Sequence, residues 1–269
     1  MSRTTMIKNW CFLCLCLTAT VASAEVKTET VIYRDGETVL EGVMVWDTTK
    51  VNGNGAKKQP GVLIVHQWLG LTDYEKGRAA QLAEMGYVAF ALDIYGQKTR
   101  PANVQEAGGF AGKYKKDRNL YRKRLQLGLE QLQKSPLVDG SKIAAIGYCF
   151  GGTGTLELAR SGAPINGVVS FHGGLDSPTP EDGKKIRSKV LILHGADDPF
   201  VPVNEIDAMK KEFDTAKVDW QMVYYSGAVH SFTQKMAGND NSKGAAYNAS
   251  ADKRSWEAMK DFFDEVFAK

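Results

Sequence analysis

Three residues in this sequence have side chains that can act together as a nucleophile, a base and an acid. Cys149, His230 and Asp198 each follow a short apolar run that predicts a β-strand. A thiol becomes an effective nucleophile when a histidine takes its proton, and the histidine needs a carboxylate to hold its tautomer and stabilise its charge. The adjacent Asp197 is a second candidate for the acid, but Asp198 is preferred because it stands three residues after Gly195. We interpret the set as a Cys-His-Asp catalytic triad.

Cys149 lies within the sequence Ile-Gly-Tyr-Cys-Phe-Gly-Gly. Residues 142–148 predict a strand and residues 153–160 predict a helix, so the cysteine falls on a sharp turn between them. On such a turn, residues two before and two after the nucleophile pass so close that only glycine fits, and Gly147 and Gly151 occupy these positions. The following helix directs its amide groups at the sulfur, which favours the thiolate.

Acyl transfer at Cys149 also requires N–H donors for the oxyanion of the tetrahedral intermediate. The backbone amide of Phe150 is one predicted donor, and the amide of Trp68, in the loop after the first apolar strand, is the other. The His-Gly-Gly sequence at 172–174 imitates an oxyanion motif of lipases, but it follows the nucleophile in the chain, so we interpret it as a strand end. Trp68, Phe150 and Tyr95 are aromatic candidates for lining an acyl pocket.

The first 24 residues have the parts of a secretory signal: two basic residues, an apolar run over 10–21, and Ala-Ser-Ala at 22–24. Because the run is shorter than the ~20 residues that span a bilayer, we expect cleavage after Ala24, a periplasmic or secreted protein, and no stable membrane insertion of the mature chain. Three of the four cysteines precede this cleavage point. Cys149 would then be a lone thiol without an intrachain disulfide partner, which in an oxidising compartment must be buried or used.

Composition predicts one soluble domain over 25–269. The chain is 43% hydrophobic and 24% charged, with a formal net charge of +3, a balance that favours neither nucleic acid nor an anionic membrane surface as a partner. The four histidines fall near separate predicted strand ends without metal-binding spacing, so no metal site and no cofactor are predicted. A monomer or weak homodimer that acts on a small molecule is expected.

Alternating strands and helices determine where these residues meet. Residues 28–33 and 38–46 alternate apolar and polar side chains around an Arg-Asp-Gly turn and predict an antiparallel hairpin at the sheet edge. Predicted parallel strands cover 61–65, 87–92, 142–148, 167–171, 190–193 and 220–225, and predicted helices cover 73–85, 117–134, 153–160, 204–215 and 251–267. Residues 93–116 are weakly periodic and predict an irregular cap over the pocket. This order specifies a doubly wound, mostly parallel α/β sheet, in which ligands bind at the carboxyl ends of the strands.

Three segments resemble the signatures of the dienelactone hydrolase family. They are Gly-Tyr-Cys-Phe-Gly-Gly at 147–152, Gly-Ala-Asp-Asp-Pro-Phe-Val-Pro at 195–202 and Gly-Ala-Val-His-Ser-Phe at 227–232, and the resemblance extends from about residue 62 to the C-terminus. A cysteine on the turn distinguishes this family from most α/β hydrolases, which use serine. The resemblance implies an α/β-hydrolase fold, the triad described above, and hydrolysis of a lactone or another activated ester.

Two positions depart from the family. Members that open dienelactones carry a glutamate that holds the resting thiol, where this chain has Gln67, and an arginine that binds the substrate carboxylate, where it has Gln234. We assign both glutamines to substrate binding, with Lys113 or Lys115 as candidates to replace a second arginine. Because an amide does not repel a thiolate, Gln67 should leave more resting thiolate than a glutamate would.

The expected function is an exported, cysteine-dependent hydrolase of esters or lactones that acts through a covalent acyl-enzyme. Two alternatives stay open: a thioesterase or acyl transferase with the same triad, and a non-catalytic binding or redox-sensing protein. The sequence does not separate them, because the first alternative uses the same residues and the second retains the fold.

Overall fold

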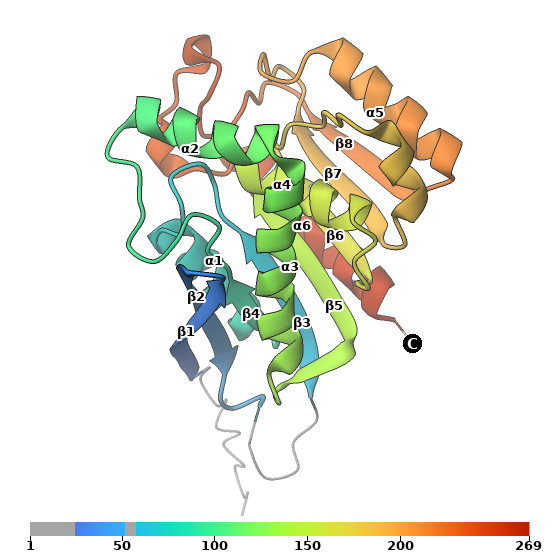
Figure 1. Ribbon diagram of the computed structural model, residues 1–269. Helices are drawn as coiled ribbons and strands as arrows, with labels where there is room; N and C mark the ends of the chain where they lie inside the picture. Colours follow the sequence, from blue (N-terminus) through green and yellow to red (C-terminus); the bar gives the residue numbers. More distant parts are fainter. Residues whose placement is uncertain (1–24, 52–57, 269) are drawn as a thin grey trace, which may run out of the picture.

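The computed structural model describes residues 25–51 and 58–268 (Figure 1). The predicted signal segment 1–24 and most of the predicted loop 50–59 lie outside the described residues. The strands are β1 Val26–Asp35, β2 Thr38–Asp47, β3 Gln59–Val65, β4 Val88–Ala91, β5 Val138–Tyr148, β6 Gly167–Phe171, β7 Lys189–Gly195 and β8 Trp220–Tyr225. The α-helices are α1 Asp73–Glu84, α2 Val104–Lys116, α3 Arg118–Lys134, α4 Phe150–Arg160, α5 Val203–Ala216 and α6 Ala249–Phe267. Three short 3-10 helices are η1 Pro180–Lys185, η2 Lys235–Ala237 and η3 Asn241–Lys243.

The strands form one eight-stranded sheet in the order β1-β2-β4-β3-β5-β6-β7-β8. The predicted hairpin is confirmed, because β1 and β2 pair antiparallel and β1 forms an edge of the sheet. β2 also pairs antiparallel with β4, and every following pair, from β4 to β8, is parallel. The carboxyl ends of the parallel strands therefore meet at one edge of the sheet, as the alternation of elements predicts.

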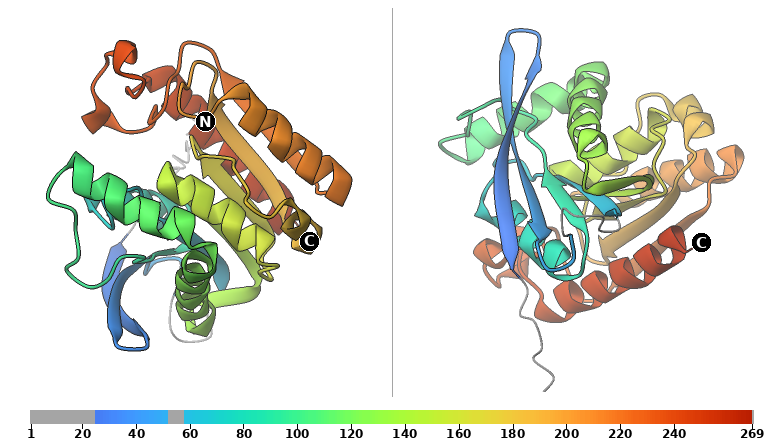
Figure 2. Two further views of the ribbon diagram at one scale, coloured as in Figure 1. Left: turned by 45° about the horizontal axis from the view of Figure 1, so that its top comes forward. Right: turned by 90° about the horizontal axis from the view of Figure 1, so that it is seen from below.

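Helices cover both faces of this sheet. α1 and α6 contribute to the apolar core on one face, and α3, α4 and α5 contribute to the core on the other (Figure 2). Successive residues of β3 enter different cores: Leu63 packs with the second group and Ile64 with the first, and both are 0% exposed. Burial on both faces explains why the central strands are continuous apolar runs, and it gives the loops at their ends a rigid base.

The prediction of an irregular segment over 93–116 is wrong in its second half, which forms α2. Glycines in this segment lower its helix propensity and weaken the periodic pattern. Three buried side chains, Ala107, Ala111 and Tyr114, nevertheless recur at helical spacing, and Asn103 caps the first turn by accepting a hydrogen bond from a backbone amide. The helix lies across the carboxyl edge of the sheet (Figure 1), which is where the sequence placed a cap.

Several boundaries differ from the predictions, and the two largest differences flank the cysteine. β5 begins at Val138, because a register shift between Pro60 and Gly61 of β3 accommodates the Asp-Gly sequence at 139–140 within the strand pair. α4 begins at Phe150, directly after the cysteine. The turn between β5 and α4 therefore consists of a single residue.

Candidate active site

Cys149 is the residue between β5 and α4, with φ 55° and ψ −116°. A positive φ is strained for a residue with a side chain and is found mainly where function requires it. A Cβ atom at Gly147 would lie 2.0 Å from the carbonyl oxygen of Gly151, and one at Gly151 would lie 2.1 Å from that of Val65. The predicted sharp turn is therefore confirmed, and glycine is required on both sides of it.

The side chains of Cys149, His230 and Asp198 meet at the carboxyl edge of the sheet. His230 Nε2 lies 3.1 Å from Cys149 Sγ, and His230 Nδ1 lies 2.8 Å from Asp198 Oδ2. The other oxygen, Asp198 Oδ1, accepts a hydrogen bond from the Phe200 amide at 2.9 Å, and the Asp198 side chain is fully buried. Asp197 is exposed. Of the two adjacent carboxylates, Asp198 is thus the one that contacts the histidine.

Charge separation between the sulfur and the imidazole is favoured in this arrangement. Burial raises the pKa of the Cys149 thiol, but the opposing charge and hydrogen bond of His230 bring the pKa below its ordinary value, with help from the Phe150 amide and the charge of Lys115. Burial lowers the pKa of His230, but the Cys149 thiolate and Asp198 raise it to about 10. Both shifts favour the form of the resting pair in which the sulfur is a thiolate and the ring is an imidazolium ion.

The two residues predicted to supply the oxyanion donors both line the cavity that contains Cys149. The Phe150 amide hydrogen-bonds to Cys149, and Trp68 lines the same cavity. Within the described residues, no protein acceptor takes the Trp68 amide proton, while the Trp68 carbonyl accepts a hydrogen bond from the Tyr95 hydroxyl at 3.0 Å. The preceding amide of Gln67 donates to the buried Glu75 carboxylate at 3.1 Å. These hydrogen bonds hold the loop that carries Trp68 in place, and the role of its amide as the second oxyanion donor stays a prediction.

A cavity of about 520 Å³ opens above the sulfur, beneath α2. Its described lining is mostly apolar and contains two lysines, Lys115 and Lys243, but no carboxylate. Of the two predicted lysines, Lys115 faces the cavity, whereas Lys113 extends over the Tyr114 ring, with Nζ 5.6 Å from the ring centroid. The lining residues are Trp68, Gly108, Ala111, Gly112, Lys115, Cys149, Phe150, Gly174, Phe200, Val201, His230, Ser231, Lys243 and Ala245.

Three residues assigned to substrate binding from the sequence do not line this cavity. Tyr95 is buried and supports Trp68 through its hydroxyl group. Gln67 is also buried, and its backbone holds the loop, so its effect on the resting thiolate stays a prediction. Gln234 lies where the chain turns into η2, and its side chain accepts a hydrogen bond from the Met236 amide at 3.3 Å. Gln234 was assigned because it stands four residues after His230, where the family has its arginine. The local turn into η2 places Gln234 outside the lining of the cavity.

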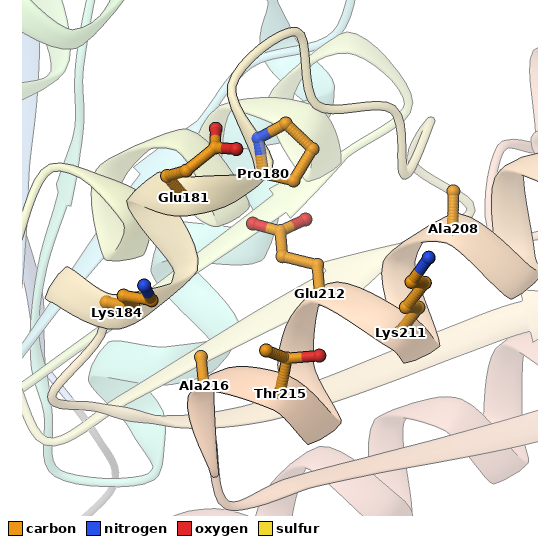
Figure 3. Close-up of a pocket in the computed structure, with 8 residues that line it drawn as sticks. All are labelled: Pro180, Glu181, Lys184, Ala208, Lys211, Glu212, Thr215 and Ala216. Carbon is orange, nitrogen blue, oxygen red and sulfur yellow. The ribbon is translucent and has the colours of Figure 1, made fainter.

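A separate hollow of about 400 Å³ lies between η1 and α5 (Figure 3). Its lining residues, all labelled in Figure 3, include none of the three candidate catalytic residues. Its one buried carboxylate, Glu212, forms two hydrogen bonds with the buried Arg160 guanidinium, at 2.9 and 2.8 Å. The Glu212 carboxylate is therefore engaged in an ion pair within the fold.

Two features of residues 25–51 and 58–268 bear on the class of site. No group of three or more His, Cys, Asp or Glu side chains in these ranges has an arrangement that could hold a metal ion. Among the same residues, no helix combines the length and apolar character that a membrane span requires. Cys149 is a free cysteine.

Comparisons with known proteins extend over most of the chain. A model described as "Dienelactone hydrolase family" matches residues 47–267. A putative carboxymethylenebutenolidase of Saccharolobus solfataricus is 26% identical over 241 residues, which cover 76% of this chain and 89% of the relative. A solved structure named m3DLH is 40% identical with a TM-score of 0.85, and the match covers 90% of this chain and 99% of that one. The dienelactone hydrolase-like promiscuous phosphotriesterase P91 from metagenomic libraries is 41% identical with a TM-score of 0.83, over 91% of this chain and all of that one.

Proposed function

The chain belongs to the dienelactone hydrolase family and is a hydrolase of carboxylic esters or lactones, and from this premise we propose that Cys149, His230 and Asp198 carry its reaction through a covalent acyl-enzyme. The observation that supports the proposal is the contact of one imidazole with both partners, 3.1 Å to the sulfur and 2.8 Å to the carboxylate. One ring can then exchange a proton with the reacting groups while the carboxylate stabilises its charged form.

In the first half-reaction the Cys149 thiolate attacks the carbonyl carbon of the ester or lactone. A carbon–sulfur bond forms, and the carbonyl oxygen becomes an oxyanion that accepts hydrogen bonds from the Phe150 and Trp68 amides. One such donor contributes roughly 3 to 4 kcal/mol to lowering the barrier. When the intermediate collapses, the carbon–oxygen bond breaks and the His230 imidazolium gives its proton to the leaving alkoxide. For a lactone, this alcohol stays tethered to the acyl group.

In the second half-reaction, His230 is neutral and takes a proton from water. The oxygen of that water attacks the thioester carbon, the carbon–sulfur bond breaks, and Cys149 leaves as a thiolate. The proton now on His230 restores the resting ion pair, and Asp198 stabilises the imidazolium in both halves of the cycle. A thioesterase or acyl transferase would use the same steps with a different leaving group or acceptor, so substrate preference must be measured.

The proposal is tested with aryl esters, lactones, thioesters and an aryl phosphotriester, which is included because P91 is named a phosphotriesterase. We expect iodoacetamide to abolish ester turnover in proportion to carboxamidomethylation of Cys149, mapped by peptide mass. Rapid quenching with an activated ester should give protein heavier by one acyl group, and Cys149→Ala should lack this adduct. Unchanged ester turnover after complete alkylation would exclude the mechanism and favour a non-catalytic binding protein.

We also propose that the protein is exported, on the basis of the basic, apolar and small-residue parts of residues 1–24. The intact mass of protein recovered from the periplasm or medium should lack these residues, and it should begin at Glu25. Full-length protein retained in the cytosol would contradict export without affecting the proposed chemistry.

A further inference from the structure

His172, the first residue after β6, contacts the loop of the nucleophile and the loop of the base. Its Nδ1 accepts a hydrogen bond at 3.2 Å from the Cys149 amide, which also donates to the Phe171 carbonyl at 3.0 Å. Its Nε2 lies 2.8 Å from Thr233 Oγ1, three residues beyond His230. The ring is fully buried, and the backbone has φ 41°. We propose that His172 is a positioning residue that sets the spacing between Cys149 Sγ and His230 Nε2. This inference rests on the proposed roles of Cys149 and His230.

The topology of the sheet explains why such a bridge is needed. The nucleophile follows β5 and the base follows β8, and these strands are separated in the sheet by β6 and β7. No strand hydrogen bond therefore joins β5 directly to β8 in the sheet. His172 stands at the end of the intervening β6, and its ring also packs edge-on against Phe232, with centroids 5.0 Å apart. One rigid side chain thus holds a fixed distance between two loops.

The bridge requires one tautomer of His172. Because Nδ1 accepts the Cys149 amide proton, Nε2 must carry the ring proton and donate it to Thr233 Oγ1. The Thr233 hydroxyl also contacts the Tyr74 hydroxyl at 2.7 Å, and Arg78 Nε donates to Tyr74 at 3.3 Å. This chain of hydrogen bonds begins at the nucleophile and ends at a guanidinium group near the surface, so each partner fixes the orientation of the next.

Neutrality of His172 is enforced by its surroundings. Burial holds the pKa of His172 well below its ordinary value, and the positive charges of His230 and Arg78 lower it further. The His172 and His230 rings are 5.3 Å apart. A second positive charge at that distance would destabilise the imidazolium that pairs with the thiolate, whereas the neutral ring leaves the ion pair intact.

The Thr233→Val substitution removes the hydroxyl group and nearly preserves the shape of the side chain. His172 Nε2–H then loses its acceptor in a buried site. The ring can recover only by moving its proton to Nδ1, which would oppose the Cys149 amide and break the bridge. We expect the pKa of Cys149 to rise by about one unit, so that alkylation on the acid side slows about tenfold. The kcat for ester hydrolysis should fall with little change in KM. Thr233→Ser keeps a hydroxyl group at this position and should restore both the pKa of Cys149 and the kcat.

A matched control separates positioning from simple loss of a buried hydrogen bond. Thr155 is also fully buried, and its hydroxyl donates to the Gly152 carbonyl at 2.9 Å, but it has no hydrogen bond to His172. Thr155→Val should lower the thermal unfolding temperature, as Thr233→Val does, and keep the alkylation profile of the unmodified protein. A folded Thr233→Val variant with the alkylation profile and kcat of the unmodified protein would overturn the proposal.

Nitrogen-15 spectra of histidine-labelled, unmodified protein provide a test that does not depend on a variant folding. We expect the His172 ring to carry its proton on Nε2 and to stay neutral across the pH range in which Cys149 is alkylated. A ring protonated on Nδ1, or one that titrates in this range, would refute the bridge. Both the spectra and the alkylation rates are measured without substrate. They therefore test the role of His172 even if the protein does not hydrolyse esters or lactones.

Discussion

The Asp198→Asn substitution removes the charge of the buried acid and keeps its shape. Asp198 Oδ1 accepts the Phe200 amide at 2.9 Å, and Oδ2 faces His230 Nδ1 at 2.8 Å. An asparagine can satisfy the Phe200 amide only with its oxygen, so its NH2 group then faces His230. Nδ1 must accept from that group, which leaves the ring proton on Nε2, directed at Cys149. In this tautomer the histidine cannot take a proton from the thiol or from water.

The size of the effect follows from what the carboxylate does. In a serine protease, the same replacement fixes the wrong tautomer with the geometry intact and lowers kcat about 10⁴-fold. The Asp198 side chain is fully buried, so water does not substitute for the lost charge. A thiol is more acidic than a serine hydroxyl and needs less help from the base, so we expect a decrease of about 10³-fold in kcat/KM, equivalent to about 4 kcal/mol.

Asp197→Asn is the matched control, because it makes the same chemical change at the adjacent, exposed position. Both variants and the unmodified protein would be compared by kcat/KM on an aryl ester and by thermal unfolding. Loss of Asp198 also removes one cause of the raised pKa of His230, so less thiolate should be available for alkylation at neutral pH. Retention of full kcat/KM in folded Asp198→Asn, or its loss in Asp197→Asn, would refute the assignment of the acid.

Replacing His230 with glutamine should raise the pKa of Cys149, because burial then acts on the thiol without an opposing imidazolium. Iodoacetamide should therefore react more slowly at neutral pH, and an identical pH profile would contradict the ion pair. Gly151→Ala would place a Cβ atom 2.1 Å from a backbone oxygen, so we expect little folded protein by circular dichroism. Gly77→Ala, whose Cβ meets nothing within 4 Å in α1, should instead stabilise the fold by about 1 kcal/mol. Arg160 is 0% exposed and forms ion pairs with two buried glutamates. Arg160→Met should therefore lower the free energy of unfolding, measured in urea, by about 3 to 5 kcal/mol. A decrease of less than about 1 kcal/mol would show that the glutamates are neutralised in another way.

Much of the sheet could be predicted from the sequence because its strands leave clear local patterns. The boundaries of β6 and β8 agree with the predictions in full, since each is a short run between turn residues. The contact of Cys149, His230 and Asp198 followed from one topological rule, that parallel strands share a carboxyl edge. For these three residues, strand order and a strand-end position were sufficient to predict their contact.

Roles that depend on the path of a loop were less predictable. Lys243 lines the cavity from η3, but nothing in the local sequence indicates that this loop returns toward the cysteine. Gln234 was placed by its spacing from His230, and a short helix redirects it. The sequence at 172–174 resembles the His-Gly-Gly motif of lipases, but the contacts of His172 are made with two loops that are distant from it in the chain. Such contacts depend on packing between loops, which periodicity and motif spacing do not encode.

Backbone strain gathers at the carboxyl edge of the sheet. Among the described residues, five residues other than glycine have a positive φ. Three of them are Cys149, His172 and Ser231, at 55°, 41° and 58°. Each such residue costs about 1 to 3 kcal/mol and persists only where the surroundings determine its conformation. Cys149 and His172 directly follow β5 and β6, whose C-terminal residues are all buried. Relaxing Cys149 would turn the nucleophile away from His230, and relaxing His172 would turn its ring away from Thr233. The apolar core that stabilises the fold therefore also maintains the geometry of the site.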